Sequence, residues 1–353
     1  MLSSLRRALR TTIYPRLPAA VLERYASHHF GARYQQPNTV YLETTSACNL
    51  NCVMCAAQRP ATKRVKPSGY MDAGLFRRLI EEIVRDLPAI DSIYLHKDGE
   101  PLLHPDIVSM LGYASARHPN VTLVTNATLL DEPMARAILA TPLQNIRFSV
   151  DGLTAATFEK VRIQLPSNEF AGTGPAIGFA AVMANIERFL ALKVALGNTT
   201  LTTGIRTTEF KPTSGEIDGY RAHWVRKVDF VDVAGLLSWT GEVGKEDDAA
   251  REPCMSPWAT LVVSWDGTLV PCCTYIDTTG HQQGALFDLT RGSLRAALQA
   301  ERRKALMLAH LDNTLNVQAP YCVPCRDWRG IPIPTIGRSR ILRQLRRVAS
   351  DGR

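Results

Sequence analysis

The chain has 353 residues, 45% of them hydrophobic and 21% charged, which is the composition of a globular protein with one large or two modest domains. No apolar run approaches the roughly 18 to 20 residues of a membrane span, and Gly and Pro are near average, which speaks against a transmembrane helix, collagen-like repeats or extensive disorder. The net charge of +8 would suit nucleic acid, but the basic residues crowd the two ends of the chain, which disfavours that partner.

Residues 1–37 form a basic N-terminal extension in which no acidic residue precedes Glu23. Its apolar residues have the spacing of one helical face: Leu2, Leu5, Leu9 and Ile13. Such a segment is either a solvated helix packed on the domain, or a membrane-surface helix or transit peptide. It lacks the apolar core and cleavage site of a secretory signal, and we expect a cytoplasmic protein.

Strand and helix patterns alternate between residues 38 and 235, as in a parallel sheet built of βα units. The apolar runs that predict strands are Thr39–Leu42, Ser92–Leu95, Val121–Val124, Ile146–Val150, Leu201–Ile205 and Phe230–Val233. The helical patterns follow the cap Asp72 and cover Ile107–Ala116, Pro133–Leu139 and Val182–Val194. Six βα units predict an α/β fold, a partial (β/α)6 barrel of the TIM type, with an inserted loop at 163–178.

The pattern changes after residue 236, where a second, smaller domain begins. Leu261–Ser264 and Thr268–Val270 flank Asp266-Gly267, which predicts a β-hairpin. A helix is expected over Leu294–Leu311. We therefore predict a small α+β domain over residues 236–330 and a basic C-terminal tail over 331–353.

The eight cysteines fall into clusters, which indicates either disulfides or metal ligands. Disulfides suit a secreted chain, whereas this one shows no signal peptide and is too large to need them, so we expect a reducing compartment. Cys48, Cys52 and Cys55 follow the first strand directly, where a barrel enzyme places its catalytic groups. Three thiolates leave one iron of a [4Fe–4S] cube open to another ligand, whereas structural zinc takes four closed ligands.

These three cysteines, with the spacing C-x3-C-x2-C, resemble the motif of the radical SAM superfamily. The segment from Asp98 to Pro105, with Gly99 and Glu100, resembles the G-G-E segment of that family. The resemblance implies that Glu100 and nearby backbone hold the amino group of S-adenosylmethionine. It extends to the ends of the third and fourth strands and assigns further cofactor contacts to Asn126, Ser149 and Arg162.

Three positions depart from the family pattern. Met54 stands where relatives often have an aromatic residue against adenine, and Asp98 replaces the more usual first glycine. The fifth strand lacks the G-x-I-x-G-x-x-E segment and offers Arg206 as a candidate substrate contact, pointing either into the barrel or to solvent.

The second cysteine group resembles twitch, a reduced form of the SPASM domain. The resemblance implies that four thiolates bind a second [4Fe–4S] cluster that relays electrons: Cys254, Cys272, Cys322 and Cys325. A zinc ribbon is the alternative for the same ligands. Their spacing resembles that of 2-deoxy-scyllo-inosamine dehydrogenase, which oxidises a carbinol. Cys273 belongs to neither ligand set. It is either an inert buried thiol or a hydrogen-atom donor in a redox-neutral reaction.

The resemblance implies an oxidoreductase that cleaves S-adenosylmethionine to a 5′-deoxyadenosyl radical, which takes a hydrogen atom from a small-molecule substrate. An amino sugar or cyclitol is expected, with flavodoxin or ferredoxin as external reductant. A peptide maturase and a redox-neutral epimerase are alternatives. In a third alternative, the chain is a zinc-stabilised protein whose basic ends bind nucleic acid or a membrane surface.

Overall fold

The structure is a computed structural model in which residues 36–55, 57, 68–164, 178–236, 251–276, 283–325, 333 and 338–351 are described, together with positions 20, 21 and 24. The apolar face expected near the N-terminus lies outside these residues. Within the described part, no helix has both the length and the apolar character needed to cross a membrane.

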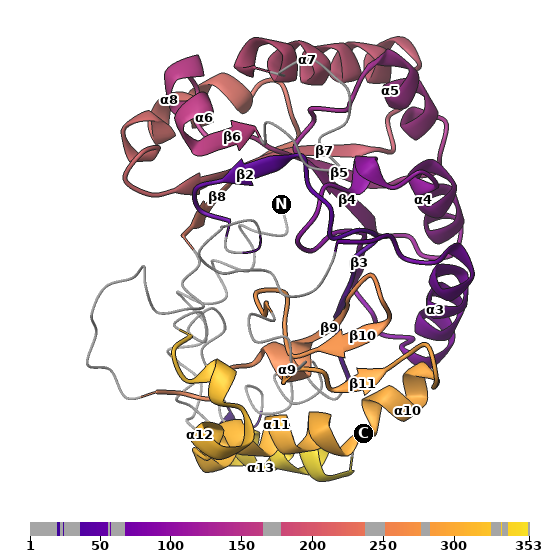
Figure 1. Cartoon of the computed structure of the whole chain (residues 1–353), viewed down its shortest axis with the longest axis vertical. Coiled ribbons are helices and arrows are strands. Elements are labelled where there is room, and N and C mark those ends of the chain that lie inside the picture. The colour runs from indigo at the N-terminus through magenta and orange to yellow at the C-terminus, as the bar shows by residue number, and fades with distance from the viewer. Residues whose placement is uncertain are drawn as a thin grey trace.

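A curved sheet of nine strands forms the centre of the molecule (Figure 1). Six parallel strands run side by side: β1 (Thr39–Leu42), β3 (Ser92–Tyr94), β4 (Val121–Thr125), β5 (Asn145–Ser149), β7 (Thr202–Glu209) and β8 (Phe230–Gly235). They coincide with the six predicted strands to within a few residues. The apolar residues of the first five are buried under helices, whereas β8 is only partly buried. The predicted partial barrel is thereby confirmed.

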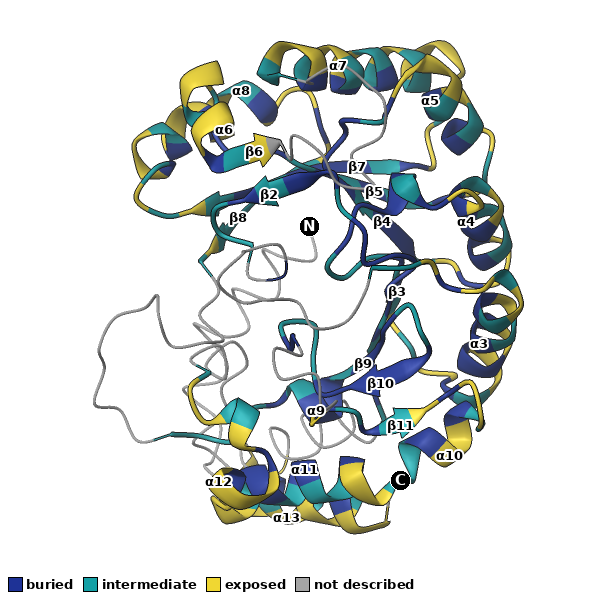
Figure 2. Ribbon diagram, viewed as in Figure 1, coloured by how far each residue is buried: buried dark blue, intermediate teal, exposed yellow. Residues whose placement is uncertain are grey.

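Helices cover the outer, convex side of the sheet, each with its apolar face inward (Figure 2). They are α3 (Ala73–Asp86), α4 (Ile107–Ser115), α5 (Glu132–Leu139), α6 (Ala155–Val161), α7 (Phe179–Ala195) and α8 (Ile217–Trp224). Asp72 caps α3 as expected, since its side chain accepts the Leu75 N–H at 2.8 Å. The main hydrophobic core lies between these helices and the strands.

The C-terminal hairpin belongs to the same sheet as the barrel. β9 (Thr260–Val263) pairs in parallel with β1, and β10 (Thr268–Val270) and β11 (Phe287–Asp288) continue from it with antiparallel pairing. The hairpin was expected, but its position beside β1 was not, because strand order across a long connection leaves no local pattern in the sequence.

The helices of this part are α9 (Ser256–Ala259), α10 (Leu294–Leu298), α11 (Glu301–Asp312), α12 (Leu315–Gln318) and α13 (Arg338–Asp351). The single helix predicted over Leu294–Leu311 is therefore divided, at Gln299 and Ala300. Part of the predicted basic tail is the helix α13, which packs Ile341 and Leu345 into a small separate core.

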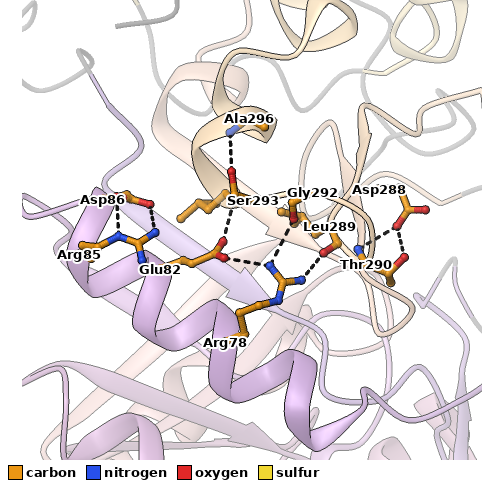
Figure 3. Close-up of polar contacts among 11 residues, drawn as sticks. Arg78, Glu82, Arg85, Asp86, Asp288, Leu289, Thr290, Gly292, Ser293 and Ala296 are labelled. Atoms are coloured by element: carbon orange, nitrogen blue, oxygen red, sulfur yellow. Dashed lines mark hydrogen bonds and ion pairs between the residues drawn. The ribbon is translucent and has the colours of Figure 1, made fainter.

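A polar contact joins the hairpin region to α3 (Figure 3). The Glu82 carboxylate accepts the Leu294 N–H at 2.6 Å and the Arg78 guanidinium at 3.0 Å. Arg78 also donates to the carbonyls of Leu289 and, at 3.3 Å, Gly292. A carboxylate at the first turn of α10 is favoured by the helix dipole, so Glu82 ties the start of that helix to the barrel.

Candidate active site

The loops that follow the strands enclose one cavity of about 270 Å³. Eight of the residues predicted for the radical SAM site line it together: Cys48, Cys52, Cys55, Gly99, Glu100, Asn126, Ser149 and Arg162. Met54 also lines this cavity. These residues come from five different parts of the chain, so the fold brings together what the motifs separately suggested.

The cysteine loop is held by a small second sheet that the sequence did not predict. β2 (Leu50–Cys52) pairs antiparallel with β6 (Arg162–Gln164), with Cys52 opposite Arg162. β6 begins the segment predicted as an inserted loop, and residues 165–177 of that segment lie outside the described residues. Pairing between strands about a hundred residues apart sets Arg162 beside the cysteines.

The loop after β3 packs tightly against the loop after β1. The Glu100 N–H donates to the Ala47 carbonyl at 2.7 Å, and a Cβ on Gly99 would lie 2.3 Å from the Thr45 carbonyl oxygen. Only glycine fits at position 99, since no side chain tolerates so short a contact. Gly99 therefore has a packing role at the cavity, next to the cysteine loop.

Glu100 is buried and fixed by three hydrogen bonds. Its carboxylate accepts the hydroxyl of Thr125 at 2.7 Å, the Asn126 N–H at 2.7 Å and the Leu102 N–H at 3.0 Å. Burial raises the pKa of Glu100, and these donors oppose the shift. A carboxylate offers about four acceptor positions, so one remains for a ligand such as an ammonium group.

Asn126 connects the loop after β4 to the cysteine motif. Its side-chain amide donates to Asn49 at 2.9 Å, and its carbonyl oxygen accepts the Thr128 N–H at 2.9 Å. Asn49 donates in turn to the Thr128 hydroxyl at 2.8 Å. This closed polar network fixes the position of the cysteine loop over the sheet.

Arg162 is held by partners within the chain. Its Nε donates to Asp151 Oδ2 at 2.7 Å, and its Nη2 donates to the Ser149 hydroxyl at 2.7 Å. Asp151 also accepts the Thr208 N–H at 2.6 Å. Burial works against the charge on Arg162, but Asp151 and Cys52 outweigh it and raise the pKa of the guanidinium. Asp151, which the sequence did not single out as a site residue, is thus the residue that positions Arg162.

Burial disfavours the thiolate form of two of the three cysteines, Cys48 and Cys52, in the absence of a metal. Burial raises the pKa of Cys48 well above its ordinary value, and it raises the pKa of Cys52 to about 11 although the nearby Arg162 lowers it. Metal binding releases such protons, because the thiolate is the ligand. Thiols grouped on one cavity wall beside a guanidinium are a donor set that fits an iron–sulfur cluster.

The cysteines of the second group lie around Cys322. Burial raises the pKa of Cys322, and Cys272, Cys254 and Cys325 raise it further, so the other three sulfur atoms lie within electrostatic reach of Cys322. Arg251 donates to the Cys325 carbonyl at 3.3 Å and ties this turn to the segment before Cys254.

All eight cysteines are free thiols. In the described ranges, no three Cys, His, Asp or Glu side chains already form a site for a single metal ion. Each thiolate of a [4Fe–4S] cube binds a different iron, so the ligands of a cluster stand further apart than those of one ion.

The cavity wall also includes His96, Lys97, Asp98 and Cys273. Arg206 is not among the lining residues and pairs with Asp232 at 3.6 Å, with about 40% of its side chain exposed. The position of His96 could have been found from the strand pattern, because Ser92, Tyr94 and His96 alternate with the buried Ile93 and Leu95.

Comparison with known families and proteins agrees with this geometry. Residues 42–209 match the model of the radical SAM superfamily, and residues 254–327 match the SPASM iron-sulfur cluster-binding domain. The tungsten-containing aldehyde ferredoxin oxidoreductase cofactor-modifying protein of Pyrococcus furiosus is 25% identical over 262 residues, which are 68% of this chain and 72% of that protein.

Mycofactocin maturase MftC of Mycobacterium tuberculosis is 29% identical over 200 residues, covering 50% of this chain and 45% of the maturase. The crystal structure of Streptococcus suis SuiB bound to the precursor peptide SuiA aligns with a TM-score of 0.56 at 14% identity. That alignment covers 83% of this chain and 74% of SuiB and shows a common fold.

Proposed function

Because the chain belongs to the radical SAM superfamily and carries a C-terminal SPASM iron-sulfur domain, we propose that it oxidises a small polar molecule by two electrons. Cys48, Cys52 and Cys55 would hold a [4Fe–4S] cluster, and the second cysteine group would hold another. When bound, the first cluster with S-adenosylmethionine supplies a 5′-deoxyadenosyl radical, and the second accepts an electron. An amino sugar or cyclitol is the proposed substrate class.

One observation carries the proposal: the three cysteines line a single cavity with Glu100 and Arg162. The remaining acceptor position of Glu100 can accept a hydrogen bond from a donor such as an ammonium group. Arg162, fixed by Asp151, keeps a positive charge at the cavity wall, where a carboxylate would be attracted. These two opposite charges fit the two charged ends of the methionine part of S-adenosylmethionine.

The test compares wild type with the triple variant Cys48→Ala, Cys52→Ala, Cys55→Ala after reconstitution without oxygen. We expect about eight irons per chain in wild type and about four in the variant, from two [4Fe–4S] clusters. With dithionite, wild type should release 5′-deoxyadenosine and the variant should not. Equal iron in both proteins, or zinc in place of iron, would contradict the proposal.

Cys273 supports a second candidate, a redox-neutral epimerase, because its side chain lines the same cavity. A thiol there could return a hydrogen atom to a substrate radical. In an epimerase, Cys273→Ala should abolish turnover, and deuterium from solvent should enter the product. In a dehydrogenase, the same variant should keep its turnover and the product should carry no solvent deuterium.

The peptide maturases among the relatives make peptide modification the third candidate. A peptide maturase would form 5′-deoxyadenosine in excess over background only with its precursor peptide. A dehydrogenase would form 5′-deoxyadenosine in excess over background with a polyol. The two are therefore separated by comparing 5′-deoxyadenosine formation with each class of substrate.

A further inference from the structure

Arg147 is a cation inside the barrel that the proposed function does not use. It alternates along β5 with Ile146 and Phe148, which are buried under the outer helices, so it points to the inner side of the sheet, as Ser149 does. Ser149 lines the cavity. Two residues along a strand span about 7 Å, so Arg147 lies one layer of side chains below the cavity.

Aromatic residues of two other strands contact the Arg147 guanidinium. Its Cζ lies 5.2 Å from the ring centroid of Tyr94 on β3 and 5.1 Å from that of Phe230 on β8. Between β5 and β8 runs β7, where Gly204 is paired with both Arg147 and Phe230. A Cβ on Gly204 would lie 2.1 Å from the Phe230 ring, so the glycine leaves the space through which this ring reaches Arg147.

The charge of Arg147 has no counter-charge in the part of the chain that the structure describes. Arg206, the other inward arginine of this layer, pairs with Asp232 at 3.6 Å, so those two charges compensate each other. The Nε of Arg147 is buried without a hydrogen bond, whereas its two Nη atoms are not enclosed and make no hydrogen bond to the described residues. A half-buried charge is costly unless it is paired, so a ligand of opposite charge is expected at the Nη atoms.

Tyr41 adds a hydroxyl group to the same layer. Its ring stacks on that of Tyr94, with 4.9 Å between the centroids and 18° between the planes. Burial raises the pKa of Tyr41, whereas Arg206 and Arg147 lower it, so both guanidinium groups lie within electrostatic reach of its hydroxyl. A phenol and a guanidinium both donate hydrogen bonds, which suits a ligand group that only accepts them.

We propose that Arg147 and Tyr41 bind an anionic group of the substrate, either a carboxylate or a phosphate. The planar guanidinium can donate two parallel hydrogen bonds to either group. This inference rests on the proposed function, because it takes the cavity above this layer to hold S-adenosylmethionine. It narrows the proposed substrate class to a sugar or cyclitol that carries an acidic group.

The experiment is isothermal titration calorimetry of the anaerobically reconstituted protein with S-adenosylmethionine present. The probes are D-glucose 6-phosphate and D-glucuronate, which separate phosphate from carboxylate, and the neutral D-glucose. We expect one of the two anions to bind at least tenfold more tightly than D-glucose. Arg147→Met should weaken that binding about tenfold or more, because hydrogen bonds to a charged group are lost. Arg147→Lys keeps the charge and should weaken it less than Arg147→Met.

Arg117→Met is the matched control. Arg117 also lies over a tyrosine ring, with its Cζ 3.6 Å from the centroid of Tyr113, but its Nε pairs with Glu81 at 2.6 Å on the outer helices. Arg117→Met should leave the affinity for the anion unchanged. Urea denaturation of each variant shows whether it is folded, and if Arg147→Met is not, the comparison of wild type with Arg147→Lys decides.

Equal affinity of wild type for D-glucose and both anions would overturn the inference, and so would binding of neither anion. An affinity for the anion that the Arg147 variants leave unchanged would overturn it too. Release of 5′-deoxyadenosine is measured in parallel with dithionite. If wild type cleaves S-adenosylmethionine while Arg147 has no effect on the binding of anions, the inference fails and the proposed function stands. If Arg147 governs the binding of the anion but wild type never cleaves the cofactor, the proposed function fails alone.

Discussion

Asp151→Asn tests the ion pair that positions Arg162 in the cavity wall. The Asp151 side chain is 1% exposed and that of Arg162 is 8% exposed, with 2.6 Å between Oδ2 and Nη2. The asparagine has the same shape but leaves the guanidinium buried without its counter-charge. Removing one partner of a buried pair costs about 3–5 kcal/mol. Because the amide still accepts a hydrogen bond, we expect the free energy of unfolding to fall by about 3 kcal/mol.

The assay is urea denaturation of the metal-free chain under reducing conditions, followed by circular dichroism. The control is Glu132→Gln, which breaks an ion pair of 2.7 Å with Arg136 in which both side chains are about half exposed. Such surface pairs contribute about 0–1 kcal/mol. Adding Arg162→Met to Asp151→Asn should restore part of the lost stability, since it removes the uncompensated charge. A loss no larger for Asp151→Asn than for Glu132→Gln would refute the reasoning.

Three further outcomes are expected. Glu82→Ala removes the carboxylate that accepts the Leu294 N–H at 2.6 Å and should lower the free energy of unfolding by about 2 kcal/mol, measured by denaturation; no change would show that the contact is dispensable. Cys254→Ala combined with Cys322→Ala should leave about four of about eight irons and keep reductive release of 5′-deoxyadenosine above background; a loss of all iron would contradict two separate clusters. Burial lowers the pKa of His96 from 6.5 to about 4 on folding. The unfolded chain therefore binds a proton at His96 more readily than the folded chain, and the free energy of unfolding is unaffected by His96 above pH 6.5 but decreases as the pH falls towards 4. His96→Asn should reduce that decrease by about 3 kcal/mol in denaturation measured at pH 7 and pH 4, and an unchanged difference would contradict the assignment.

The barrel strands and the cysteine ligands could be predicted because their signals are local. Apolar runs mark strands buried on one face by helices, and closely spaced cysteines mark a ligand loop. The pairing of β2 with β6 could not be predicted from the sequence. The two strands are short, lie about a hundred residues apart, and have sequences that favour no particular partner. The role of Asp151 could not be predicted either, because it depends on the contact with Arg162 that the fold creates.

The position of Cys273 follows from the strand pairing that joins the C-terminal hairpin to the barrel sheet. β9 pairs with β1, and β10 pairs with β9, so the segment after β10 is fixed to the barrel by main-chain hydrogen bonds rather than by a linker. That segment carries Cys272 towards the second cysteine group and Cys273 towards the cavity. The two thiols are neighbours in sequence, so the cavity wall and the second group are one peptide bond apart. A change in the pairing of β9 with β1 would therefore move both sites together.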